Sequence, residues 1–117
     1  MTQVKNKFIL IDNEIIGGRV VFHRDLFRLH HKSYPKGGGW WYFHKEQNKL
    51  FLYGCSFDFG SLTREEVMSA ELGGSFMNMK DVEVIFDSRD SLNVLDILTE
   101  HLGEEEGIRC VTECDFI

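Results

Sequence analysis

Residues 37–60 read GGGWWYFHKEQNKLFLYGCSFDFG and contain the clearest local signals for the fold. Three glycines lead into an aromatic run at 40–44, which predicts a strand. A polar turn at 45–48 and a second apolar run at 49–54 predict that the chain folds back as a β-hairpin. It then leaves the hairpin through a loop at 54–60 that begins and ends with glycine.

Upstream of this hairpin the pattern predicts two more strands and a short helix. The apolar residues of 7–12 and 15–22 are typical of strands, with a hairpin-like connection between them. Residues 25–31 have a weak helical pattern, which must end before Pro35 because the residue before proline disfavours helical backbone.

Downstream, helix and strand signals alternate. Thr63 and Glu66 have the spacing of a capping box, so we expect a helix over residues 64–72. Residues 80–86 alternate polar and apolar side chains, as a half-buried strand does.

The last thirty residues predict one helix and one strand. Ser91 can cap a helix that Gly103 terminates. Its leucines follow helical spacing: Leu92, Leu95, Leu98 and Leu102. We expect residues 104–106 to form a solvated loop and the alternating residues 108–116 to form a last strand.

Length and composition bound the class of protein. A chain of 117 residues with 43% hydrophobic and 27% charged residues is the size and composition of one globular domain. Its mixture of hairpins and helical crossovers predicts an α+β fold, with a single mixed β-sheet of about six strands packed with two or three helices.

Charge and cysteine content argue against several functions. A net charge of −6 opposes general attraction to nucleic acid or to anionic membranes, so we expect neither as a partner. The early apolar run at 8–11 is too short for a signal peptide or a membrane span. The cysteines Cys55, Cys110 and Cys114 are too few for a disulfide framework, and we therefore expect a cytoplasmic protein.

Two features could support chemistry at a site. The loop at 54–60 can turn backbone N–H groups toward one point and form an anion-binding nest, to which Ser56 would add a hydroxyl, although such loops commonly have no ligand. His23 lies where a strand gives way to a helix, so its side chain can overhang the end of a sheet. Histidine also titrates near neutral pH, which suits a general base, but a surface or core role is equally compatible with its position.

A metal site is not predicted. On the expected last strand, Cys110 and Cys114 would share a face but lie about 13 Å apart, too far to bind one zinc ion. The remaining histidines show no ligand spacing, and we expect neither a metal nor another cofactor.

Three segments resemble the Janus/Ocnus family of phosphohistidine phosphatase-like proteins. Residues 37–60 are similar to its signature of three glycines followed, after about a dozen residues, by YGxSxxxG. Residues 22–27, FHRDLF, are similar to the family's aromatic-His-x-Asp stretch, and residues 7–11, KFILI, to its first strand. Residues 88–117 fall outside the resemblance, so we expect one phosphohistidine phosphatase-like domain over 1–117 with a C-terminal helix–strand extension at 88–117.

The resemblance implies a metal-independent phosphatase. It implies that His23 is the catalytic general base and that Lys7 and the loop residues Ser56, Phe57 and Asp58 hold the phosphate. The substrate would be a phosphohistidine-containing protein or a small phosphoramidate.

Asp58 is the reason for predicting alternative functions beside the phosphatase. The family has a small or uncharged residue at this position, and a carboxylate beside a bound phosphate repels it. The chain could thus be a non-catalytic member of the same fold that binds a partner protein or an anionic ligand, or a different hydrolase that uses His23 with Asp58 and Ser56. A side chain of Asp58 that points into the pocket would favour a ligand other than phosphate.

Overall fold

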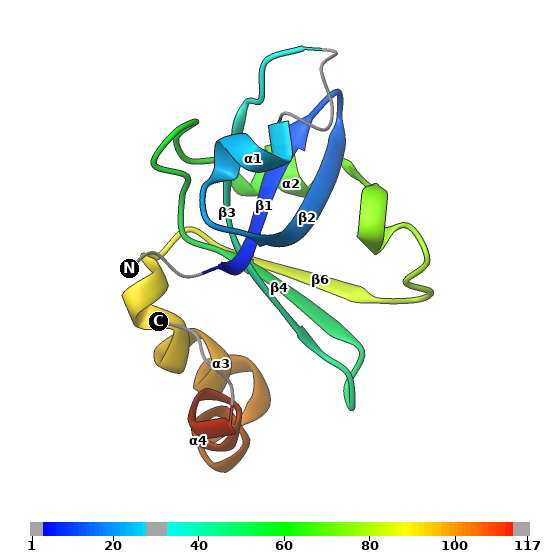
Figure 1. Cartoon of the computed structure of the whole chain (residues 1–117). Coiled ribbons are helices and arrows are strands. Elements are labelled where there is room, and N and C mark those ends of the chain that lie inside the picture. Colours follow the sequence, from blue (N-terminus) through cyan, green and yellow to red (C-terminus); the bar gives the residue numbers. More distant parts are fainter. Residues whose placement is uncertain (1–3, 28–32, 114–117) are drawn as a thin grey trace.

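The computed structural model describes residues 4–27 and 33–113, which form one mixed sheet with helices on both faces (Figure 1). The sheet order is β5-β2-β1-β3-β4-β6. The strands are β1 (Lys5–Ile11), β2 (Glu14–Val20), β3 (Gly37–His44), β4 (Lys49–Tyr53), β5 (Glu71–Leu72) and β6 (Glu83–Asp87). The α-helices are α1 (His23–Phe27), α2 (Arg64–Met68), α3 (Val94–Leu102) and α4 (Glu104–Glu113), and short 3-10 helices span Gly74–Phe76 and Ser91–Asn93.

The pairing of the strands confirms the predicted α+β class and the mixed sheet. The β1–β2 and β3–β4 hairpins are antiparallel, and β1 joins them by pairing antiparallel with β3. At the two edges, β5 runs parallel to β2 and β6 runs parallel to β4. A parallel neighbour requires a crossover connection, and α2 lies within the connection between β4 and β6.

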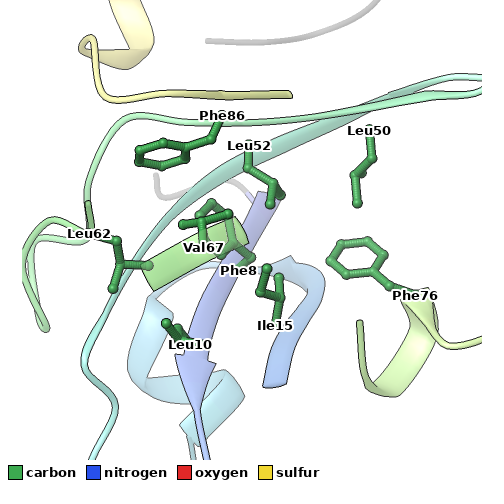
Figure 2. Close-up of a cluster of buried hydrophobic side chains, with 9 residues drawn as sticks. All are labelled: Phe8, Leu10, Ile15, Leu50, Leu52, Leu62, Val67, Phe76 and Phe86. Atoms are coloured by element: carbon green, nitrogen blue, oxygen red, sulfur yellow. The ribbon is translucent and has the colours of Figure 1, made fainter. Parts of the chain in front are cut away.

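One face of the sheet packs against α2 and the first 3-10 helix. Figure 2 shows this core, in which side chains of β4 and β6 face those of the β1–β2 hairpin. Phe76 approaches Gly17 so closely that a Cβ there would lie 2.2 Å from the Phe76 ring. The glycine pair in the second predicted strand thus makes room for an aromatic ring. The buried members of this core are Phe8, Leu10, Ile15, Leu50, Leu52, Leu62, Val67, Phe76 and Phe86.

The opposite face is covered in two separate places. Near the β1–β2 hairpin, Leu26 of α1 packs on Ile9, Ile11 and Ile16. Over β4 and β6, helices α3 and α4 cover a second cluster, and Figure 1 shows the two helices stacked together and apart from α1. That cluster contains Phe51, Tyr53, Ile85, Val94, Ile97, Leu98 and Cys110.

The helix predicted over residues 64–72 is correct in its start and too long at its end. Thr63 accepts a hydrogen bond from the Glu66 amide, and Glu66 accepts one from the Thr63 amide, so the predicted capping box is present. The helix stops at Met68 because residues 71–72 pair with β2 as an edge strand. A two-residue strand has no periodicity that a sequence pattern could reveal.

The predicted C-terminal strand is wrong over residues 108–113, which belong to α4, and the predicted loop at 104–106 is the first turn of that helix. Glutamates favour a first helical turn, and the i,i+4 spacing lets Arg109 pair with Glu113 at 2.8 Å. The described part of the extension is therefore a helix pair, α3 and α4, rather than a helix and a strand. Residues 114–116 of that prediction lie outside the described part of the chain, as do residues 28–31 of the first predicted helix.

The helix predicted after Ser91 is confirmed, but the residues that follow Asp90 first form the 3-10 helix Ser91–Asn93, which Asp90 caps by accepting from the Leu92 amide at 2.9 Å. Helix α3 begins at Val94 without a side-chain capping bond from Asn93, and Gly103 ends it with a positive φ of 94°. No helix among the described residues is long and apolar enough to cross a membrane.

Candidate functional site

A pocket of about 350 Å³ lies on the sheet face that carries α1. Its walls come from β1, β3, the first turn of α1 and the loop that follows β4. Lys7 and Trp40 are directly paired neighbours in the β1–β3 register, so their side chains project from the same face of the sheet. The lining residues are Lys7, Val21, Phe22, His23, Arg24, Trp40, Cys55, Phe57 and Asp58.

His23 is buried against the sheet, with 4% of its surface exposed. Its Nε2 lies 2.7 Å from the carbonyl oxygen of Gly39, which can only accept a hydrogen bond, so Nε2 carries the proton in the neutral ring. Nδ1 then has the free lone pair. Among the described residues, no fully buried side-chain nitrogen or oxygen lacks a hydrogen-bond partner, and none is found for Nδ1. Nδ1 is therefore accessible to solvent, and His23 lines the pocket.

The surroundings of His23 favour its neutral form. Burial lowers its pKa below the ordinary histidine value, and the positive charge of Lys7 acts in the same direction. The Gly39 carbonyl and the Asp58 carboxylate act in the opposite direction and reduce the shift. At neutral pH the ring is therefore an uncharged base.

The close approach of His23 to β3 requires a glycine. A Cβ at Gly38 would lie 3.1 Å from Cδ2 of His23 and 2.3 Å from the carbonyl oxygen of Phe8. It would also lie 3.3 Å from Cβ of Ser56. Gly38 thus leaves the space in which the histidine ring and the loop after β4 meet.

Lys7 supplies a half-buried cation to the same pocket. Its ammonium donates to the carbonyl oxygen of Val21 and lies 5.0 Å from the Trp40 ring centroid and 6.0 Å from that of Phe22. Burial lowers the pKa of Lys7, while Asp58 and Asp25 oppose that shift. Two of the three ammonium hydrogens remain for a ligand once Val21 has taken one.

The loop at 54–60 is closed by its own hydrogen bonds. Gly60 and Ser56 exchange backbone bonds of 2.8 and 3.0 Å, and the Ser56 hydroxyl accepts from the Phe59 amide. Ser56 is buried at 3% exposure and is not part of the pocket lining, so it shapes the loop from inside. Within the described chain, no protein acceptor is found for the amides of Cys55, Phe57 and Asp58 in this loop.

Asp58 points into the pocket. One carboxylate oxygen accepts from the Arg24 amide at 3.2 Å, and the other lies 3.9 Å from the Arg24 guanidinium. That guanidinium stacks 4.2 Å from the Phe22 ring centroid. Asp58 therefore caps the first turn of α1 from another loop, since Phe22, which precedes the helix, has no side-chain acceptor.

The structure brings together Lys7, His23, Phe57 and Asp58 from the residues that the sequence singled out. Sequence reasoning did not identify Arg24, whose position next to His23 in FHRDLF is the one signal for it. Trp40 entered the sequence analysis only as part of the aromatic run at 40–44 that predicts a strand. The tryptophan enters the site because the antiparallel register sets it opposite Lys7, which a single sequence does not reveal.

A second polar cluster lies between β3 and α4. His44, Glu106 and Cys110 place potential ligand atoms within 4.8 Å of one another. The Gln47 amide donates to Nδ1 of His44, so the protonated Nε2 donates to Glu106 at 2.7 Å. A metal ion would need that Nε2 lone pair, and the cluster is therefore better described as a polar contact that fixes α4 to the sheet.

Comparisons with protein-family models, with curated proteins and with solved structures found no match.

Proposed function

We propose that this protein is a metal-independent phosphatase that hydrolyses phosphohistidine or a related phosphoramidate. The observation that carries the proposal is the state of His23, a neutral imidazole that lines a pocket, whose Nε2 is held by Gly39 and whose basic Nδ1 is accessible to solvent. Lys7 lies in the same pocket. A positioned base beside a cation is the arrangement that phosphoryl transfer to water needs.

The reaction balances with these groups. Water attacks phosphorus while Nδ1 of His23 takes its proton, and the P–N bond breaks as the leaving nitrogen takes a proton from solvent. Lys7, with the amides of Phe57 and Asp58, neutralises the phosphoryl oxygens. Because Gly39 holds the protonated Nε2, the imidazole needs no reorientation before it accepts the proton.

The test is turnover of a phosphoramidate and of phosphohistidine-labelled protein in the presence of EDTA. We expect His23→Asn to lower kcat/KM by roughly 10²–10⁴-fold, the usual contribution of a general base. His101→Asn, on the exposed end of α3, is the matched control and should leave the rate unchanged. Because the pKa of His23 is lowered, the acid limb of the wild-type pH profile should lie below pH 6.5.

Full turnover by His23→Asn would refute the assignment. So would an acid limb above pH 6.5, because the base would then have a raised rather than a lowered pKa.

A second candidate is a non-catalytic protein of the same fold that binds an anionic ligand or a partner protein. The direction of Asp58, whose carboxylate lies inside the pocket, favours the partner protein or another ligand that is not phosphate. The two candidates differ in the assay above, since only the first predicts turnover that depends on His23.

A further inference from the structure

The pocket contains an anion of its own, the carboxylate of Asp58. Only 21% of this side chain is exposed, and it is held by the amide and the guanidinium of Arg24. It also lies close enough to Lys7 and to His23 to influence the charge of both. Arg24, one of the residues that would attract a phosphoryl group, is thus already in contact with a carboxylate.

The balance of charges in the pocket explains why an incoming anion can replace the carboxylate of Asp58. Lys7 and Arg24 bring two positive charges to the pocket and Asp58 brings one negative charge, while His23 is neutral. One positive charge therefore remains in excess among the lining residues, and Asp25, which lies outside the lining, also acts on Lys7. An incoming anion is attracted by the cations and repelled by Asp58, and it gains the Arg24 donors only if the carboxylate moves away.

The contacts of Asp58 are of the kind that an external anion can replace. The distance from its carboxylate to the Arg24 guanidinium is 3.9 Å, longer than a charge-assisted hydrogen bond, and the Arg24 side chain is 51% exposed. The Arg24 amide belongs to the first turn of α1, and the Arg24 guanidinium stacks on the Phe22 ring. Displacement of one carboxylate would leave these donors in place for another oxyanion.

We propose that the carboxylate of Asp58 is an internal anion: it occupies the place beside Arg24 where an oxygen of a phosphoryl group would otherwise bind. It thereby sets the affinity of the pocket for phosphoryl groups. Arg24, through its amide and its guanidinium, is then a further phosphate-binding residue, available once Asp58 is displaced. The inference rests on the proposed function in that it uses the same pocket, but it concerns binding and not turnover.

The test is a titration of the full-length protein with inorganic phosphate at pH 7.5 and constant ionic strength, followed by backbone amide shifts. Three proteins are compared with the wild type. Asp58→Asn keeps an oxygen that can accept from Arg24 but removes the charge, and Asp58→Ala removes both. Asp96→Asn makes the same change of charge on the exposed face of α3 and is the control.

We expect Asp58→Asn to bind phosphate roughly tenfold more tightly than the wild type, because a repulsive charge within a few ångströms is removed. Asp58→Ala should bind at least as tightly as Asp58→Asn, with the largest new shift at the Arg24 amide, and Asp96→Asn should match the wild type. If Asp58→Ala loosens α1, the charge effect is still measured by Asp58→Asn, which keeps the capping oxygen.

Equal phosphate affinity in the wild type and Asp58→Asn would overturn the proposal, as would weaker binding by either variant or no binding by any of the proteins. Turnover that depends on His23, together with unchanged phosphate affinity in the Asp58 variants, would refute the internal anion and leave the phosphatase standing. Tighter phosphate binding without turnover would support the internal anion and refute the phosphatase.

Discussion

At the scale of single residues, the site depends on Gly38, which has no side chain, and on the buried ring of His23. Gly38 has no Cβ, so the ring of His23 reaches β3 and donates to the carbonyl of Gly39. This bond selects the tautomer with a basic Nδ1, and burial keeps that tautomer uncharged. The chemistry of His23 therefore comes from its contact with a neighbouring strand.

Gly38→Ala should damage both stability and site. The new Cβ would press on the Phe8 carbonyl and the His23 ring, so we expect a loss of about 1–3 kcal/mol in the free energy of unfolding. Urea denaturation measures this loss. Gly18→Ala is the matched control, because its Cβ would meet only the flexible end of Leu26, at 3.0 Å, and should cost about 1 kcal/mol or less. Equal losses in the two variants would contradict the steric explanation.

At the scale of elements, short helices are held by contacts from elsewhere in the chain. Helix α1 has five residues, too few to be stable alone, and it is held by Leu26 in the core and by the Asp58 cap from the loop after β4. Helix α4 is held in a similar way by the pair of Glu106 with His44 of β3. Arg109 adds further contacts, to Glu46 as well as to Glu106.

The packing of α4 against β3 should become less stable at low pH. Arg109, and then His44, hold the pKa of Glu106 at about 2, below its ordinary value of 4.5. A lowered pKa means that Glu106 stabilises the fold above about pH 4.5 and that this contribution is lost as the pH falls toward about 2. Urea midpoints measured across this range should therefore fall more steeply for the wild type than for Glu106→Gln.

Glu105→Gln provides the control for the loss of one negative charge. Glu105 lies in the same turn of α4 but is exposed, so its variant should follow the wild-type curve. Parallel curves for Glu106→Gln and the wild type would show that Glu106 does not fix α4 to β3.

At the scale of the whole molecule, two thiols lie in different environments on one face of the sheet. Cys55 is exposed in the loop after β4 and lines the pocket, whereas Cys110 belongs to the buried side of α4 and is 2% exposed. Figure 1 shows that α3 and α4 cover a part of the sheet separate from α1. The two cysteines therefore report on different regions, one on the pocket and one on the integrity of the core.

A thiol reagent should distinguish these two regions. In a Cys114→Ser background, we expect Cys55 to react at once and Cys110 to react roughly 1000-fold or more slowly, because its exposure requires the helices to open. The rates follow from absorbance with an aromatic disulfide reagent, and Cys55→Ser isolates the slow phase. Reaction of Cys110 at the rate of Cys55 would show that α4 does not seal the core.

The sequence determined the local elements that have a strong signal of their own. The β3–β4 hairpin follows from two apolar runs around a polar turn, the start of α2 from the spacing of Thr63 and Glu66, and the end of α3 from Gly103. The pocket loop and His23 were also recognisable, because glycines and a histidine at a strand end are distinctive residue types. These features depend on neighbours in the chain, and neighbours are what a single sequence records.

Only the tertiary structure decided the features that depend on distant residues. Residues 108–113 alternate like a strand, yet they form a helix, in which Cys110 packs into the core and Glu106 contacts β3. Asp58 faces Arg24 because sheet register and loop closure bring residues 34 positions apart into contact. Local pattern cannot fix such contacts, because their free energy comes from burial and charge pairing that exist only after the strands have assembled.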